Sequence, residues 1–193
     1  MSGKIKSTIE LAMEKAAKLP RLTEEEIRQR REEEYGPRGR AIAELILRGE
    51  LAVDRLDAEL SRYDGEQGEI VQRAFLTSLC QAMDLEDAEA TTRAFEGIRA
   101  VVRDGPLEEA SSRWSGILRD YEEQRQQKFS MTEEAESVLL RDLGVSGSTI
   151  RLNLQENERW RRERSALLER FRPQVEEIKR ELCDHLRRVT SRA

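Results

Sequence analysis

The feature that most constrains this chain is the apolar stripe between Ile70 and Met83. Apolar residues recur there at the spacing of one helical face, so the segment predicts a helix. Leu76 and Cys80 widen the stripe and leave only a narrow polar edge. A helix with this much apolar surface needs neighbours on several sides. We therefore expect an all-α fold, a multi-helix bundle with Ile70–Met83 as its central helix and a long charged helix at the C-terminal end.

Composition supports long helices. Charged residues make up 38% of the chain and hydrophobic residues 37%, so some helices are expected to stand out into solvent or to pair with partners. The chain has few glycines and prolines, and Glu, Arg, Leu and Ala, which dominate it, are good helix formers.

Turn signals divide the chain into three predicted parts. Residues 1–35 form a charged N-terminal helical arm that ends at the Gly36-Pro37 break. Residues 36–123 form the bundle, where short gaps between helices favour antiparallel neighbours. The polar run at 122–128 is interpreted as a helix end or a linker. Residues 132–193 form a C-terminal helical region, which is expected either to pack on the bundle or to meet a partner.

Charge and hydropathy limit the classes of partner. The net charge is −5, which argues against nucleic-acid binding over the whole surface. No run of apolar residues is long enough for a transmembrane segment. The two cysteines lie on separate predicted helices and do not suggest a disulfide framework, and no leader pattern is recognised, so we expect a cytoplasmic protein.

No residue pattern indicates catalysis. The sole histidine, His185, lies two positions from Cys183, and residues two apart on a helix point in nearly opposite directions. One histidine and two cysteines do not supply a zinc site. Carboxylates mostly have Arg or Lys at helical pairing distance. We expect a non-catalytic chain with no cofactor and no metal.

The C-terminal helix carries a candidate interface. Apolar residues there alternate at spacings of three and four, the heptad pattern of a coiled coil, and charged residues avoid the seam. The candidate helix-pairing residues are Phe171, Val175, Ile178 and Leu182. Two ways of covering this seam remain open: the chain's own bundle, or a second copy in a homodimer, which is the simplest expectation.

A second candidate lies within Thr132–Asn153. Gly144, Val145, Ser146 and Ile150 occupy positions at which the segment resembles a helix-turn-helix DNA-binding motif. The resemblance implies a recognition helix in which Ser146, Ser148 and Arg151 face phosphates or base edges. Leu140 and Asn153 depart from the pattern, where a small residue and an apolar residue are usual. A plain Gly/Ser turn between two helices is the alternative.

The expected function is therefore that of a non-catalytic helical interaction or assembly protein, which binds a protein partner or a second copy of itself. The alternative is a DNA-binding regulator that uses the segment Thr132–Asn153, although acidic residues shortly after this segment would repel phosphate.

Overall fold

The computed structural model describes residues 23–102, 105–144 and 153–190 of the chain. Its described elements are all helical, which confirms the predicted all-α class. They are α2 (Glu24–Leu47), η1 (Val53–Arg55), α3 (Leu56–Leu60), α4 (Gly65–Gln81), α5 (Ala88–Val101), α6 (Gly105–Asp142), η2 (Leu154–Glu156) and α7 (Glu158–Thr190). Residues 1–22, most of the predicted arm, lie outside the described residues.

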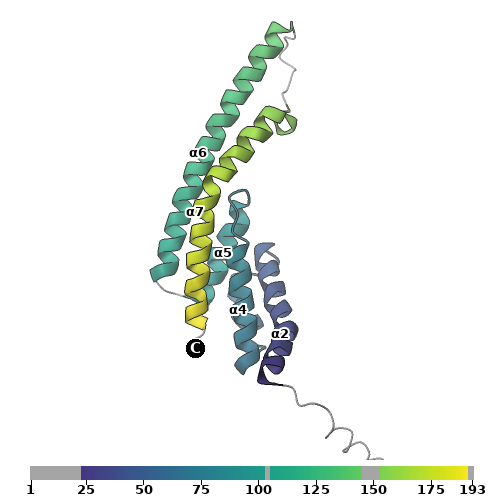
Figure 1. Ribbon diagram of the computed structural model, residues 1–193, viewed down its shortest axis with the longest axis vertical. Coiled ribbons are helices and arrows are strands. Elements are labelled where there is room, and N and C mark those ends of the chain that lie inside the picture. Colours follow the sequence, from purple (N-terminus) through teal and green to yellow (C-terminus); the bar gives the residue numbers. More distant parts are fainter. Residues whose placement is uncertain (1–22, 103–104, 145–152, 191–193) are drawn as a thin grey trace, which may run out of the picture.

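Helix α4 is the centre of the bundle, as its apolar stripe predicts. It packs against α2, α5 and α7, which surround it (Figure 1). Phe75, Leu79 and Cys80 on this helix are completely buried. The wide stripe on α4 therefore has a neighbour on each of its apolar sides.

Helix α2 continues through Gly36 and Pro37, so the chain break expected there is wrong. Its start agrees with the local sequence, since Thr23 and Glu26 form a capping box. Gly39 lies against α4, and a Cβ atom on it would come within 2.2 Å of the Val71 carbonyl oxygen. Gly39 thus lets the two helices approach each other closely.

Helices α2 and α4 run in the same direction rather than antiparallel. Arg31 pairs with Glu66 near the start of both helices, and Gly39 lies beside Val71 further along both (Figure 1). The segment between them carries η1 and α3, and it returns the chain to the end of the bundle at which α2 begins. A connection with its own short helices can make this return, whereas a tight turn cannot.

Helices α6 and α7 form an antiparallel pair along one side of the bundle (Figure 1). Helix α6 has 38 residues, which corresponds to about 57 Å. It continues through the polar run at 122–128, so the linker expected there is wrong. Helix α7 continues through Pro173, and Figure 1 shows a bend in its first half, as expected from the missing N–H of a proline.

The division into three parts stays a prediction, although two of its expected boundaries fall inside continuous helices. Among the described residues, no helix is both long and apolar enough to cross a membrane. The compartment in which the protein resides also stays a prediction.

Candidate functional site

The predicted pairing seam on α7 is covered by the chain's own helices. Phe171, Val175, Ile178 and Leu182 are between 0 and 7% exposed. The Phe171 ring meets the Tyr121 ring of α6 edge to face, with centroids 5.7 Å apart. Of the two coverings that the sequence leaves open, the described residues have the chain's own bundle, because α4 and α6 pack on the seam, and self-association of the chain stays a prediction.

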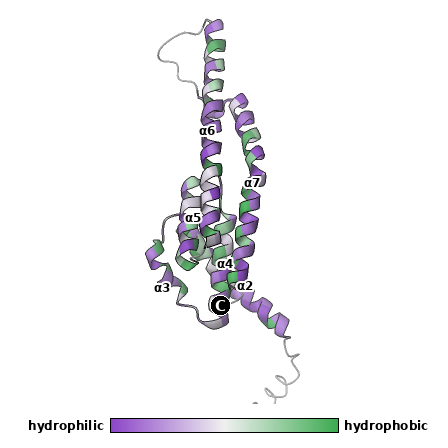
Figure 2. Cartoon of the chain, turned by 90° about the vertical axis from the view of Figure 1, so that its left-hand side faces the viewer, coloured by the Kyte–Doolittle hydropathy of each residue, from purple (hydrophilic) through white to green (hydrophobic). Residues whose placement is uncertain are grey.

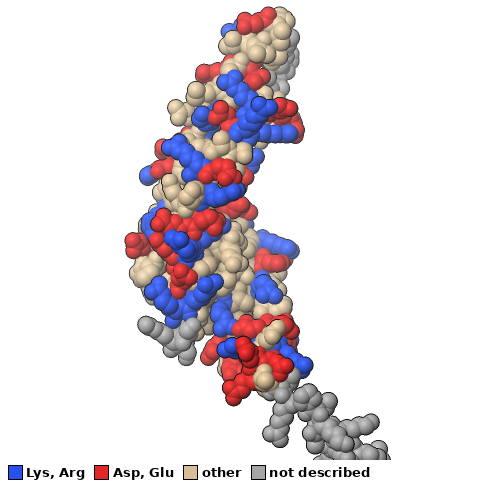
Figure 3. All heavy atoms as spheres, in the orientation of Figure 1, with Lys and Arg blue, Asp and Glu red and all other residues tan. Residues whose placement is uncertain are grey.

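The DNA-contact candidates Ser146, Ser148 and Arg151 lie outside the described residues. The helix predicted to precede the turn is described, and it is the end of α6 rather than a separate short helix. On the face shown in Figure 3, basic and acidic side chains are interspersed. The described residues thus add no argument for a DNA-binding surface, and DNA binding stays a prediction.

Helix α7 begins against the second half of α6. Asn157 caps α7 by accepting a hydrogen bond from the Trp160 backbone N–H at 3.0 Å. The Trp160 ring then packs on Phe129 of α6, with ring centroids 5.0 Å apart. Lys128 donates a hydrogen bond to Glu163 at 2.9 Å, and this contact lowers the pKa of Glu163. These contacts hold the two helices together at the point beyond which α6 projects.

Beyond this junction, α6 extends past the start of α7 (Figure 1), and its course there includes hydrophobic residues (Figure 2). We define residues 131–143 as the α6 tip. Its large exposed apolar residues are Met131 (57% exposed), Val138 (52%), Leu139 (56%) and Leu143 (69%). Four of the six large apolar residues that are exposed in the described part of the chain lie on this segment. A concentration of this kind marks a candidate interaction surface.

The exposed residues form a stripe rather than a ring. At about 100° per residue, Met131, Val138 and Leu139 fall within an arc of roughly 100° around the helix axis. Thr132 is buried and donates to the Lys128 carbonyl oxygen at 2.9 Å, and it lies seven residues before Leu139, so the two residues share nearly the same side of the helix. The exposed apolar stripe of the tip thus continues, further along α6, a side of the helix that is covered at Thr132.

Sequence reasoning missed this surface because its apolar pattern looks like that of any core helix. In the sequence, nothing distinguishes Leu139 and Leu143 from apolar residues that a helix buries within its own chain. The preceding polar run at 122–128 could have indicated that the next apolar residues are exposed. This run lacks an apolar face, and α6 begins to leave the bundle there.

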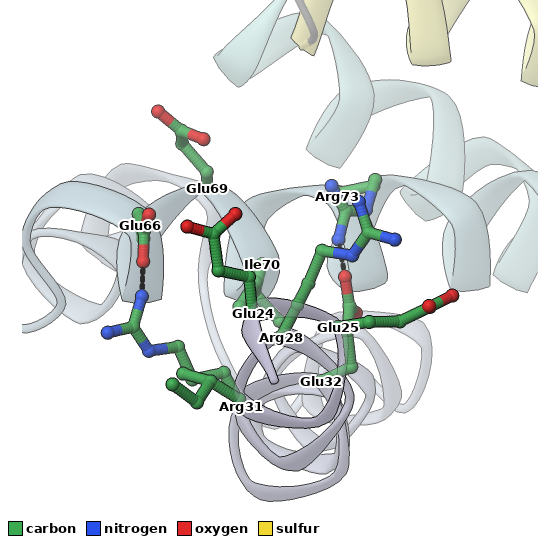
Figure 4. A pocket seen from close by; sticks show the side chains of 10 residues that line it. Glu24, Glu25, Arg28, Arg31, Glu32, Glu66, Glu69, Ile70 and Arg73 are labelled. Atoms are coloured by element: carbon green, nitrogen blue, oxygen red, sulfur yellow. Dashed lines mark hydrogen bonds and ion pairs between the residues drawn. The ribbon is translucent and has the colours of Figure 1, made fainter. Parts of the chain in front are cut away.

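A groove with a volume of about 730 Å³ lies between the starts of α2 and α4 (Figure 4). Ion pairs Arg31–Glu66 and Arg73–Glu32 connect the two helices across it. The charged side chains that line it are mostly exposed, and Figure 4 shows both pairs pointing toward one another. These contacts join two helix ends, and they place no buried acid or base where it could act on a substrate.

The described residues also lack a group of three or more His, Cys, Asp or Glu side chains placed to hold a metal ion. The expectations of no metal, no cofactor and no catalysis stay predictions.

Comparison with known proteins adds no functional assignment: no protein-family model matches the chain, and no curated protein or solved structure is detectably similar to it.

Proposed function

We propose that this chain is a non-catalytic helical assembly protein, and that the α6 tip is the surface at which a second copy binds. The observation that carries the proposal is the exposed apolar stripe on the tip. Met131, Val138 and Leu139 lie on one side of a helix that has left its own bundle. Covering apolar surface is favourable by about 25 cal/mol per Å², so such a stripe gains free energy from a partner helix.

Charges along the edge of the stripe favour a second copy in the antiparallel direction. Glu134 and Arg141 are both exposed and lie seven residues apart, so they share one edge of the helix. When two tips pair in opposite directions, each Arg141 comes opposite the partner's Glu134. In a parallel pair each edge faces the other edge of the partner, so Glu134 and Arg141 would not meet. The α6 tip of each copy thus supplies both the apolar contact and the opposite charges that pair across it.

The expected association is weak. At about 1.5 Å per residue the tip is roughly 20 Å long, so a contact between two tips is smaller than the ~1,600 Å² of a standard stable interface. We expect a dissociation constant in the micromolar range or above, with the two copies exchanging rapidly.

Sedimentation equilibrium of the full chain over a wide concentration range tests the proposal. The wild type should pass from monomer to dimer, and Leu139→Glu should remain a monomer. Leu45→Glu is the matched control, because Leu45 is an exposed leucine on α2, away from the tip. This control should dimerise like the wild type. A monomeric wild type at all concentrations, or dimerisation that Leu139→Glu leaves unchanged, would contradict the proposal.

A charge exchange tests the direction of pairing. Arg141→Glu should weaken dimerisation, because it places two carboxylates opposite each other. Adding Glu134→Arg to this variant should restore the dimer, since each pair is again of opposite charge. Failure of the double variant to recover would exclude the antiparallel register.

The DNA-binding alternative is tested separately, because no described residue favours it. Fluorescence anisotropy with labelled duplex DNA at physiological salt is expected to show weak binding or none. Tight binding that Arg151→Ala abolishes would support the regulator instead.

A further inference from the structure

The only two cysteines of the chain meet between α4 and α7. Cys80 and Cys183 are 103 positions apart in the sequence, yet their sulfur atoms lie 2.6 Å from each other. Cys80 is completely buried, and Cys183 is partly exposed. Both are free thiols in the structure. Placement on separate helices did not predict this contact, because the packing of α7 on α4 creates it.

We propose that Cys80 and Cys183 form a reversible disulfide that joins α7 to the central helix under oxidising conditions. The site is independent of the α6 tip and does not require the proposed assembly. A disulfide requires two cysteines whose side chains point toward each other across adjoining segments. The contact between the two sulfurs meets this requirement with both helices in their observed positions.

In a redox pair, one cysteine reacts with the oxidant and a second, resolving cysteine then forms the disulfide with it. The two thiols here differ in hydrogen bonding and pKa as these two roles require. Cys80 donates a hydrogen bond to the Lys179 carbonyl oxygen at 3.2 Å, and Cys183 donates to the Cys80 sulfur. When Cys183 loses its proton, the Cys80 S–H can turn and donate to the new thiolate. This hydrogen bond is the main cause that lowers the pKa of Cys183, and nearby Arg187 and Lys179 lower it further. The same hydrogen bond and burial raise the pKa of Cys80.

Accessibility assigns the first step to Cys183, because oxidants reach accessible thiolates first. The Cys183 thiolate attacks one oxygen of hydrogen peroxide, the O–O bond breaks, and hydroxide leaves, which makes a sulfenic acid. The Cys80 sulfur then attacks the Cys183 sulfur, the S–O bond breaks, and the departing hydroxide takes the Cys80 proton as water. Two thiols and one peroxide thus give one disulfide and two waters, and a thiol reductant reverses the change.

The disulfide would stabilise the chain, since it closes a loop of about 100 residues in the unfolded state. A loop of this length corresponds to a rise in Tm of roughly 10 °C for a protein of this size.

The test uses the full chain, reduced and then treated with hydrogen peroxide. Intact-mass spectrometry should show the loss of two hydrogens without a change in oligomeric state. A non-reducing digest should yield one cross-linked peptide pair that contains Cys80 and Cys183, and Tm should rise and then return after reduction. A chain that keeps both thiols, or that forms only disulfides between molecules, would overturn the proposal.

Two variants separate the roles of the thiols. In Cys80→Ala, Cys183 should accumulate as a sulfenic acid that a 1,3-dione reagent labels, because the resolving thiol is gone. In Cys183→Ser, Cys80 should stay unlabelled in the folded protein. Labelling of Cys80 rather than Cys183 would contradict the assigned order. The wild-type mass measurement remains decisive if either variant folds poorly.

Discussion

The α7 seam and the α6 tip are two apolar stripes of the same chemical kind with opposite surroundings. Ile178 at the centre of the seam is 0% exposed, whereas Leu139 on the tip is 56% exposed. The seam has the more regular heptad spacing, and that regularity suggested an interface between copies. The structure covers the seam with its own helices and leaves the tip open.

The difference lies in which neighbours each stripe meets. The seam runs beside α4 and the first half of α6, so both of its flanks are covered. The tip lies beyond the contact of Phe129 with Trp160, where α7 begins. An apolar stripe therefore indicates that a helix needs a partner surface, but the stripe itself does not identify that surface.

Ile178→Asp should have the largest effect. A carboxylate in the buried seam would have no compensating charge, so we expect a loss of more than about 4 kcal/mol in the free energy of unfolding. Urea unfolding followed by circular dichroism measures it. Val138→Asp is the matched control on the tip and should change stability by less than about 1 kcal/mol. If Ile178→Asp stays as stable as its control, the two stripes do not differ as described.

Gly39→Ala should come next, with a loss of about 1–3 kcal/mol, because the new methyl group would meet the Val71 backbone and push α2 away from α4. The control is Gly116→Ala on α6, where a Cβ atom meets nothing within 4 Å. There we expect a gain of about 0.5–1 kcal/mol from helix propensity. Equal effects of the two substitutions on thermal unfolding would argue against close packing of α2 on α4.

Glu163→Gln should have a smaller effect at the base of the tip. Lys128 lowers the pKa of Glu163 in the folded state, so the ionised form adds stability above the ordinary pKa of a glutamate. This contribution is lost as the pH falls through the lowered pKa. The pair is largely exposed, so the variant should lose only about 0.2–1 kcal/mol at pH 7. The free energies of unfolding of the wild type and the variant should converge as the pH falls. A difference that stays constant with pH would show that the effect does not come from the Lys128–Glu163 pair.

Leu139→Gln should have the smallest effect on the stability of the monomer, within about 0.5 kcal/mol, because the leucine is exposed and both residues favour helix. Thermal unfolding at low protein concentration measures this quantity without self-association. A larger loss would show that Leu139 packs within its own chain. The tip would then be covered, as the α7 seam is.

Local features can be recognised from the sequence alone. The Thr23–Glu26 capping box forms between neighbours in the chain, and the α4 stripe is wide enough to require burial in any arrangement. Signals for chain breaks failed at Gly36-Pro37 and in the run at 122–128. A glycine can serve a turn or a close helix contact, and Gln, Glu, Arg and Lys continue a helix as readily as they end one.

The sequence by itself thus determined the helical class, the identity of the central helix and the presence of two apolar stripes that need covering. Only the tertiary structure decided that α7 covers its own seam, that the α6 tip faces solvent and that Cys80 meets Cys183. The physical reason is the range of the interactions. Caps and helical periodicity act within a few residues, whereas each of these contacts depends on the direction and register of helices far apart in the chain.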